Sequence, residues 1–339
     1  MKVPTHADAF EVLCLQAASD GRNEVLFGDC LQRARTSLRP FMLGREFPYV
    51  YLEFPLIGDP FMDVTMLYGL VDQGTHVDSP AAPHSDELFD WYAPLKRTFN
   101  DIAFGFELDV ENPELPAAAV HFQPRAHREL VEPFCSVAGE PERAALYLDL
   151  AERMPANWDL SFFGMFRGRP GSPLRVCGYL LPEEVSRCAE DAHHLPDVFG
   201  TVGFTAYDDA MLEQVRTLLA ACSTYVDYQF DVYPDGSLGD TFALDIELDE
   251  KNPRAIQQSF SSGMSAQIMG MLEAWGAADE RWKRAGSVGF ARALPVELGD
   301  GSMGRYSFAL MPHWLKARWR GGILQPSKLY LSARAGLLD

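Results

Sequence analysis

Charged side chains recur at every second position in the strand-like segments of this chain. Glu53 stands between Leu52 and Phe54, and one apolar residue separates Asp245 from Glu247. Successive side chains of a strand point to opposite faces, so each segment buries one face and turns the other toward water. Carboxylates gathered on a wet face can accept hydrogen bonds, take up protons or bind a cation.

The same alternation places further polar residues on the face that carries these carboxylates. Its acidic and amide members are Glu53, Asp63, Glu107, Asp109, Gln123, Asp227, Gln229, Asp231, Asp245 and Glu247. Its basic members are Arg125, Arg167, Arg175, Arg305 and Lys328, and its tyrosines are Tyr49, Tyr51, Tyr179, Tyr233 and Tyr330. A small barrel filled only by packing has apolar side chains inside. This composition therefore indicates a lumen that holds water or a ligand.

The segments that must position these residues form five units, each a strand pair followed by helical sequence. The pairs begin near residues 49, 103, 160, 225 and 288, and recurrence at such spacing indicates a repeated supersecondary unit. The fifth pair is predicted to begin at Val288, to turn at 299–302 and to return at 306–310, with a last strand at 328–333. We predict an α+β fold: an antiparallel barrel of about ten strands with a polar lumen, surrounded by α-helices.

Amphipathic stripes between the strand pairs predict the helices. The longest stripe runs from Ile256 to Trp275, after the cap and first-turn proline at Asn252 and Pro253. No linker divides the chain, so we expect one domain over 1–339, with a helical lead-in at 1–47 and the repeat barrel at 48–334. His313, Trp314 and the segment 319–322 are expected in a turn or in a loop over the barrel mouth.

Composition excludes several classes of partner. The 339 residues carry a net charge of −19, which argues against nucleic acid, because a phosphate backbone needs a basic face. We expect no signal peptide, and no apolar stretch is long enough to span a membrane. The six cysteines show neither CxxC nor zinc-like spacing, so we expect reduced thiols and a cytoplasmic location.

Several of these segments resemble the ABBA prenyltransferases, and in particular the cyanobactin-type peptide prenyltransferases. The similar segments are YVYLEF at 49–54, FGFEL at 104–108, VHFQ at 120–123, VDYQFDVY at 226–233, FALDIEL at 242–248 and KLYL at 328–331. The resemblance covers the chain from about 48 to 334. It implies the transfer of a dimethylallyl-type group from an allylic diphosphate to a peptide side chain or to a small aromatic or basic acceptor.

The resemblance also implies roles for single residues. Glu53 is the candidate catalytic residue, as a base or as the acceptor that orients the nucleophile. The candidate diphosphate-binding residues are Arg125, Arg167, Arg175, Arg305, Lys328, Tyr179 and Tyr330. The candidate acceptor-binding residues are Tyr51, Asp227, Gln229, Asp231, Tyr233 and Glu247.

The sequence departs from the family pattern in two ways. The second strand, at 62–66, carries no cation where the family usually has one, and the predicted lumen holds many carboxylates. Neighbouring carboxylates raise one another's pKa unless a cation joins them. That cation is either Mg²⁺ bridging to the diphosphate or a cationic acceptor such as a guanidinium or an amine. No residues are assigned as metal ligands.

Two other readings stay open. A barrel that has lost its diphosphate site would be a non-catalytic peptide-binding protein in natural-product biosynthesis, and the missing cation on the second strand favours it. Five acid-rich repeats also suit a pentein-like guanidine-modifying enzyme. That class relies on a cysteine near the C-terminus, whereas the last cysteine here is Cys222.

Overall fold

Ten antiparallel strands form one closed barrel in the computed structural model, which describes residues 2–19, 24–77, 84–110, 117–121, 127–167, 169–248 and 252–338. In order around the ring they are β1 (Tyr49–Pro55), β2 (Asp63–Tyr68), β3 (Ala103–Asp109), β4 (Ala117–His121), β5 (Asp159–Met165), β6 (Leu174–Leu180), β7 (Val226–Val232), β8 (Leu238–Glu247), β10 (Met303–Arg320) and β12 (Lys328–Leu338). Pairing of β10 with β8 closes the ring. The predicted α+β barrel is confirmed.

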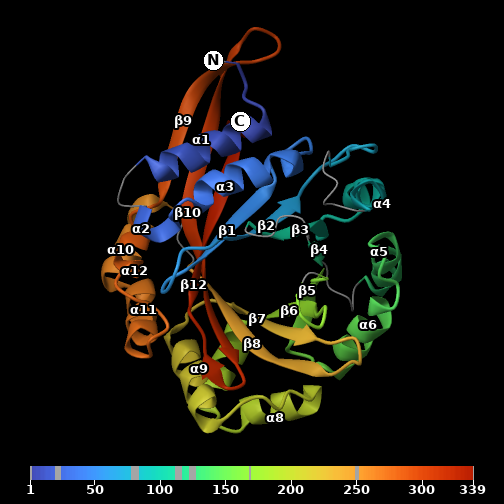
Figure 1. The fold of residues 1–339 in the computed structure, drawn as a ribbon, viewed down its shortest axis with the longest axis vertical. Helices are drawn as coiled ribbons and strands as arrows, with labels where there is room; N and C mark the ends of the chain where they lie inside the picture. The colour runs from blue at the N-terminus through green and yellow to red at the C-terminus, as the bar shows by residue number, and fades with distance from the viewer. Residues whose placement is uncertain are drawn as a thin grey trace.

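Helices surround the barrel (Figure 1). The first three are α1 (His6–Ala18), α2 (Glu24–Phe27) and α3 (Cys30–Ser37), and α1 contacts β10 and β12. The others are α4 (Ser85–Thr98), α5 (Val131–Val137), α6 (Arg143–Arg153), α7 (Pro182–Glu190), α8 (His194–Val202), α9 (Asp209–Ala221), α10 (Pro253–Ser262), α11 (Met264–Ala274) and α12 (Trp282–Ala285). Within the described ranges, none of these helices has the length and apolar character needed to cross a bilayer.

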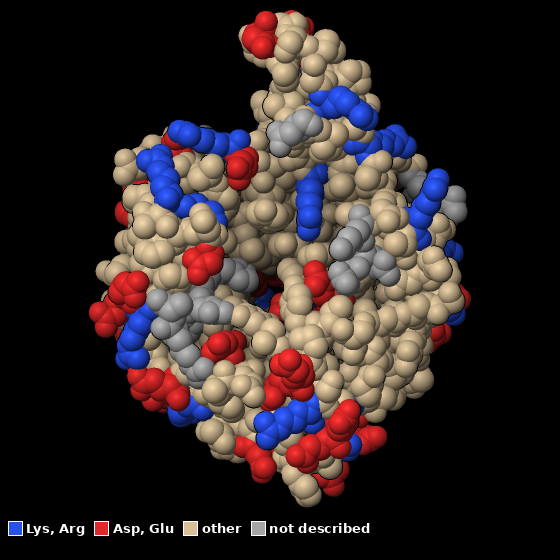
Figure 2. Space-filling view, turned by 180° about the vertical axis from the view of Figure 1, so that it is seen from behind, with Lys and Arg blue, Asp and Glu red and all other residues tan. Residues whose placement is uncertain are grey.

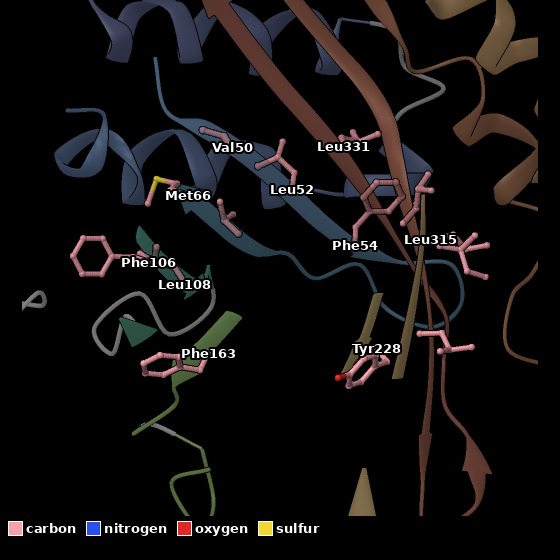
Figure 3. Close-up of a cluster of buried hydrophobic side chains, with 14 of the residues drawn as sticks. Val50, Leu52, Phe54, Met66, Phe106, Leu108, Phe163, Tyr228, Leu315 and Leu331 are labelled. Atoms are coloured by element: carbon pink, nitrogen blue, oxygen red, sulfur yellow. The ribbon is translucent and has the colours of Figure 1, made fainter. Parts of the chain in front are cut away.

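The apolar face of each strand packs outward against the helices. Val50, Leu52 and Phe54 on β1 are each at most 1% exposed, and they belong to the main hydrophobic cluster (Figure 3). Burying such a side chain stabilises the fold by roughly 1.5–3 kcal/mol. Because side chains alternate, this packing forces the intervening residues, such as Tyr51 and Glu53, into the lumen.

The two ends of the barrel differ in the connections that join the strands there. At what we call the hairpin end, short loops join the two strands of a unit, as at 56–62, 166–173, 233–237 and 321–327. At what we call the helix end, the strands connect to the surrounding helices. The direction of each strand therefore fixes which end a lumen residue approaches: on β7, Asp227 is nearer the helix end and Asp231 nearer the hairpin end.

The fifth strand pair has its predicted turn, but the predicted end of its second strand and its place in the barrel are wrong. Among the described strands, β9 (Phe290–Glu297) pairs with β10, Glu297 also bridges to Lys2, and this hairpin projects beyond the barrel (Figure 1). Strand β10 continues to Arg320, and its second half pairs with β8 from Trp314 onward, where a loop was expected. The register shifts between Pro312 and Trp314, and this irregularity interrupts the alternation that would have shown one strand of 18 residues.

The longest predicted helix is in fact two helices. Gly263 has extended backbone angles, φ −100° and ψ −158°, and separates α10 from α11. A Cβ at Gly263 would lie 2.9 Å from the Cα of Ser259, so the close turn favours glycine. The hydroxyls of Ser259 and Ser265, 2.8 Å apart, hydrogen-bond across the break.

Candidate active site

A cavity of about 220 Å³ opens inside the barrel. Figure 2 shows the molecule from behind, with a hollow near the centre of this face and charged side chains within it. The cavity is lined by Tyr51, Thr65, Leu67, Glu107, Phe162, Cys177, Asp227, Gln229, Asp245, Trp314, Lys316 and Tyr330. All are residues of nine of the ten barrel strands, so the alternation of the strands has produced a mixed polar and apolar chamber.

Four cations, which we call the basic group, lie in the lumen and at its hairpin end: Lys316, Lys328, Arg175 and Arg169. Lys316 on β10 and Lys328 on β12 lie opposite each other in the strand register and are only 4% and 6% exposed. Arg175 on β6 is 8% exposed. Charged nitrogens this far from water need partners, because the desolvation cost is otherwise large.

Glu53 supplies the partner for both lysines. Its Oε1 lies 2.9 Å from Nζ of Lys328 and 3.9 Å from Nζ of Lys316. Lys328 also donates to Oδ2 of Asp63 at 2.7 Å, and Lys316 donates to the Tyr330 hydroxyl. Burial opposes the charged form of Glu53, but the charges of the two lysines outweigh it and hold the pKa of Glu53 below its usual range. Such a carboxylate is a weak base and fixes the lysines in place.

The arginines differ in how fully they are paired. Arg175 donates from Nε to Oδ1 of Asp231 at 3.0 Å. The guanidinium of Arg169 lies 3.8 Å from the centre of the Phe166 ring, and among the described residues it has no ion-pair partner within 4.0 Å. Burial and the nearby Arg175 lower the pKa of Arg169, while Glu107 acts in the opposite direction. Arg169 is thus a cation held near the lumen by stacking and available to an anion.

Three carboxylates, which we call the acidic group, occupy β7 and β8: Asp227, Asp245 and Glu247. Asp227 and Asp245 are direct partners in the β7–β8 register. Burial raises the pKa of Asp245 to about 6, although Lys316, 3.5 Å from its Oδ2, acts against this. Burial and the neighbouring carboxylates also raise the pKa of Asp227 well above its usual range. Asp245 can therefore exchange a proton near neutral pH, and Asp227 is shifted toward its neutral form.

Aromatic rings, which we call the aromatic wall, stand beside the acidic group toward the helix end: Tyr51, His313 and Trp314. The Tyr51 ring centre lies 4.7 Å from that of Trp314 and 5.6 Å from that of His313. Trp314 is also the direct register partner of Glu247. An aromatic face next to carboxylates attracts cations by two additive effects.

One part of the cavity wall is apolar. Leu67 and Phe162 line the cavity, and Phe162 packs with Ala119 and Cys177 in a small cluster separate from the main core. Burial raises the pKa of the Cys177 thiol well above its usual range, so this cysteine stays protonated and behaves as an apolar group. An apolar ligand chain can therefore pack against this part of the wall.

The structure brings together some of the predicted diphosphate-binding residues. Lys328, Arg175 and Tyr330 lie in the lumen with Glu53, the predicted catalytic residue. Tyr179 also belongs to β6 but lies four residues beyond Arg175 toward the helix end, roughly 13 Å along the strand.

Two of the other predicted diphosphate-binding cations lie outside the lumen, and a third lies outside the described residues. Arg167 is 40% exposed in its side chain and binds Glu140 of the α5–α6 connection, with Nε 2.6 Å from Oε1. Arg305 is exposed on the projecting part of β10, eleven residues or roughly 35 Å along the strand from Lys316. It was assigned to the lumen because the fifth strand pair was misplaced. Arg125 and the neighbouring Gln123 lie outside the described residues.

The predicted acceptor-binding residues divide between the two ends. Tyr51, Asp227 and Gln229 line the cavity, and Glu247 is the register partner of Trp314. Asp231 instead pairs with Arg175. Tyr233 lies in the β7–β8 hairpin loop, where Gly236 donates its N–H to the Tyr233 carbonyl.

Sequence reasoning missed Lys316, Trp314 and Arg169. The first two could have been found from the sequence. Trp314 and Lys316 alternate with the apolar Leu315 and Ala317, which is the pattern of the other barrel strands. Arg169 follows β5 in a hairpin loop, and no strand periodicity could assign it a direction.

One set of potential metal ligands occurs among the described residues, away from the lumen. Glu184 and Cys188 on α7 lie within metal-binding reach of His194 on α8, and all three are buried. Glu184 already accepts a hydrogen bond from Nε1 of Trp158 at 2.7 Å and is bonded to His194. These contacts satisfy Glu184 and join α7 to α8.

No protein-family model matches this chain, and no curated protein matches it. Among solved structures, it is similar to the prenyltransferase PriB in its apo form, with a TM-score of 0.46 and 10% identity over 98% of this chain and 96% of that one. The ternary complex of PriB with L-tryptophan and dimethylallyl thiolodiphosphate gives a TM-score of 0.46 and 11% identity, with the same coverage. The prenyltransferase NotF gives 0.40 and 11% over 90% of this chain and 87% of that one. Because these TM-scores and identities are low, the reaction of this chain has to be inferred from the residues in its own lumen.

Proposed function

We propose that this protein transfers a short isoprenoid group from an allylic diphosphate to an acceptor bound in the barrel lumen. The observation that carries the proposal is one lumen with three zones: the basic group, an apolar wall with Phe162, and the acidic group, with Lys316 lying between Glu53 and Asp245. These zones match the three parts of the reaction, namely a leaving anion, an apolar chain and a nucleophile that loses a proton. The polar lumen face expected from the sequence supports the same reaction.

The basic group would bind the diphosphate. Its cations Lys316, Lys328 and Arg175 are paired with the carboxylates of Glu53, Asp63, Asp231 and Asp245. Burial raises the pKa of Glu107, which favours its neutral form despite the nearby Arg175. Arg169 therefore remains for an anion, and the lysines need little rearrangement because Glu53 already fixes them.

The transfer step would run between the two charged groups. The bond between C1 of the allyl group and the diphosphate oxygen breaks, and its electron pair leaves with the diphosphate. A new bond forms between C1 and the acceptor nucleophile, whose proton passes to a carboxylate of the acidic group. Asp245, with its pKa of about 6, is suited to take that proton. Phe162, Trp314 and Tyr330 would shield the allylic cation from water and stabilise it through their ring faces.

The size of the cavity favours a short donor. Binding pockets for drug-sized ligands usually measure about 300–1,000 Å³, and this cavity measures about 220 Å³. We therefore propose a dimethylallyl group rather than a longer isoprenoid. A peptide side chain stays among the proposed acceptors because of the resemblance of 49–54 and 226–248 to the cyanobactin-type enzymes.

Magnesium is not required in this proposal. At the basic group, the oxygens of Glu53, Asp63 and Asp231 each lie within 3.0 Å of a lysine or arginine nitrogen. Lysine and arginine would thus perform the charge neutralisation that Mg²⁺ supplies elsewhere. A metal would have to displace these pairs to reach the carboxylates.

A peptide-binding barrel without catalysis is the second candidate. The absence of a cation on the second strand favoured it, but Lys316 supplies a positive charge that strand β2 lacks. The pentein-like alternative loses its support, because the strands close into one ring and do not form five separate blades.

The proposed function can be tested with dimethylallyl diphosphate. We expect it to raise the melting temperature of the protein and, with an acceptor, to give a product heavier by one C5H8 unit in mass spectrometry, with release of diphosphate. Indole, tyrosine and arginine peptides form the acceptor panel. No stabilisation at millimolar donor and no product from any acceptor would favour the binding protein.

A further inference from the structure

We propose that the acceptor carries a cationic nitrogen group, a guanidinium or an ammonium, which the acidic group binds against the aromatic wall. This inference rests on the proposed function, because it names the acceptor for the same lumen.

The charge balance around the acidic group is the first reason. Among the described residues, neither Asp227 nor Glu247 has a lysine or arginine nitrogen within 4.0 Å, and only Asp245 shares Lys316. Asp227 and Asp245 lie directly opposite each other on neighbouring strands, where like charges destabilise the pair. A bound cation would relieve this repulsion, whereas a neutral acceptor would leave it in place.

An unpaired buried oxygen is the second reason. Asp245 is only 6% exposed and borders the cavity, yet its Oδ1 has no hydrogen-bond partner among the described residues. Its other oxygen, Oδ2, accepts from Gln229 and faces Lys316. Leaving such an oxygen unpaired costs about 1–3 kcal/mol, and more when it is charged. A ligand N–H donor in the cavity would satisfy it.

The spacing of the carboxylates indicates an organic cation and not a metal ion. In the described part of the chain, no three lumen carboxylates bring their oxygens within 4.8 Å of one another, as a bound metal ion would require. Guanidinium and alkylammonium groups present several donors over a wider span, so they can bridge carboxylates that do not converge on one point.

The aromatic wall completes the site. The ring centres of His313 and Trp314 lie 4.4 Å apart, and Tyr51 contacts both rings. A planar guanidinium can stack on such faces, and cations over aromatic rings gain about 0.5–2 kcal/mol. Arg334 is the cation nearest the wall on β12, but it is exposed and donates to Ser332, so it leaves the acidic group free.

Three probes of equal chain length but different charge test this inference: butylguanidine, butylamine and neutral butylurea. Their binding is measured by calorimetry at pH 8 in the presence of inorganic diphosphate. We expect one of the two cations to bind at least tenfold more tightly than butylurea. Asp227→Asn and, separately, Glu247→Gln should each weaken that binding about tenfold. Glu297→Gln, which removes an exposed carboxylate from the projecting hairpin, should leave it unchanged.

The outcomes separate the two proposals. Equal affinities for all three probes, or tighter binding of neutral indole than of either cation, would overturn the cationic acceptor. Unchanged cation binding in both folded carboxylate variants, checked by circular dichroism, would overturn it as well. If diphosphate stabilises the protein while the cations do not bind, the transferase remains and only the acceptor class is lost. If neither binds, the proposed transferase itself fails.

Discussion

The basic group and the acidic group lie in one lumen but differ in how completely their charges are paired. In the basic group, Glu53 and Asp63 hold Lys328 within 2.9 Å, and Glu53 lies 3.9 Å from Lys316. In the acidic group, Asp227 has no ion-pair partner among the described residues, and one oxygen of Asp245 has no hydrogen bond. The paired region is rigid before a ligand arrives, which suits a leaving anion. Without a ligand, the buried unpaired carboxylates of the acidic group destabilise the protein, and a ligand of opposite charge would remove that cost.

The largest expected effect comes from removing the central cation of the basic group. Lys316 contacts Glu53, Asp245 and Tyr330, so Lys316→Met should remove both its charge and its orientation of Tyr330. We expect transfer to fall by about 100-fold or more, as when a preorganised charge-stabilising donor is lost. Steady-state rates with varied donor measure this. Arg320→Met is the control, because Arg320 lies at the exposed end of the same strand. A wild-type kcat and KM in the lysine variant would remove Lys316 from the site.

The next effect concerns stability. Glu53→Gln leaves two buried lysines without their shared carboxylate, and we expect a loss of about 3 kcal/mol in the free energy of unfolding at pH 7. Because the lysines hold the pKa of Glu53 below its unfolded value of about 4.3, the wild-type advantage should be present above that pH and vanish as the pH falls through the folded pKa. Chemical denaturation between pH 7 and pH 3 measures the difference. A constant difference across this range would show that Glu53 stabilises by packing alone.

A smaller effect should appear in the pH dependence of acceptor binding. Burial raises the pKa of Asp245 to about 6, and Lys316 acts against this effect. Glu53 raises the pKa further, and Arg175 lowers it. Its neighbour Asp227 has a raised pKa as well. Protonation removes the negative charge that a cation needs, so the affinity for butylguanidine should fall about tenfold between pH 8 and pH 5. Asp245→Asn should flatten that dependence, and an unchanged slope would assign the titration to another group.

The smallest effect is expected from removing divalent metal. Since lysine and arginine nitrogens already occupy the carboxylates of the basic group, a chelator should change the transfer rate by less than about twofold. The comparison is made with and without added Mg²⁺ after chelation. A strong dependence on Mg²⁺ would mean that the carboxylates of the basic group release their partners to bind the ion.

The sequence predicted the barrel because each strand must bury one face, and that constraint is visible in period-two alternation. It failed where the alternation was interrupted. The shift between Pro312 and Trp314 hid the second half of β10, so Lys316 was missed and Arg305 was assigned in its place. No local pattern reveals an ion pair between distant strands. Glu53 was therefore predicted to be a base, whereas in the structure Lys316 of β10 and Lys328 of β12 lie beside its carboxylate.

Calorimetric titration with inorganic diphosphate tests the division of the lumen most directly, using the wild-type protein, Lys316→Met and Asp227→Asn. We predict measurable binding to the wild type, at least tenfold weaker binding to Lys316→Met, and binding to Asp227→Asn within twofold of the wild type. Equal binding to all three proteins, or no binding to the wild type, would contradict the assignment of the anion to the basic group.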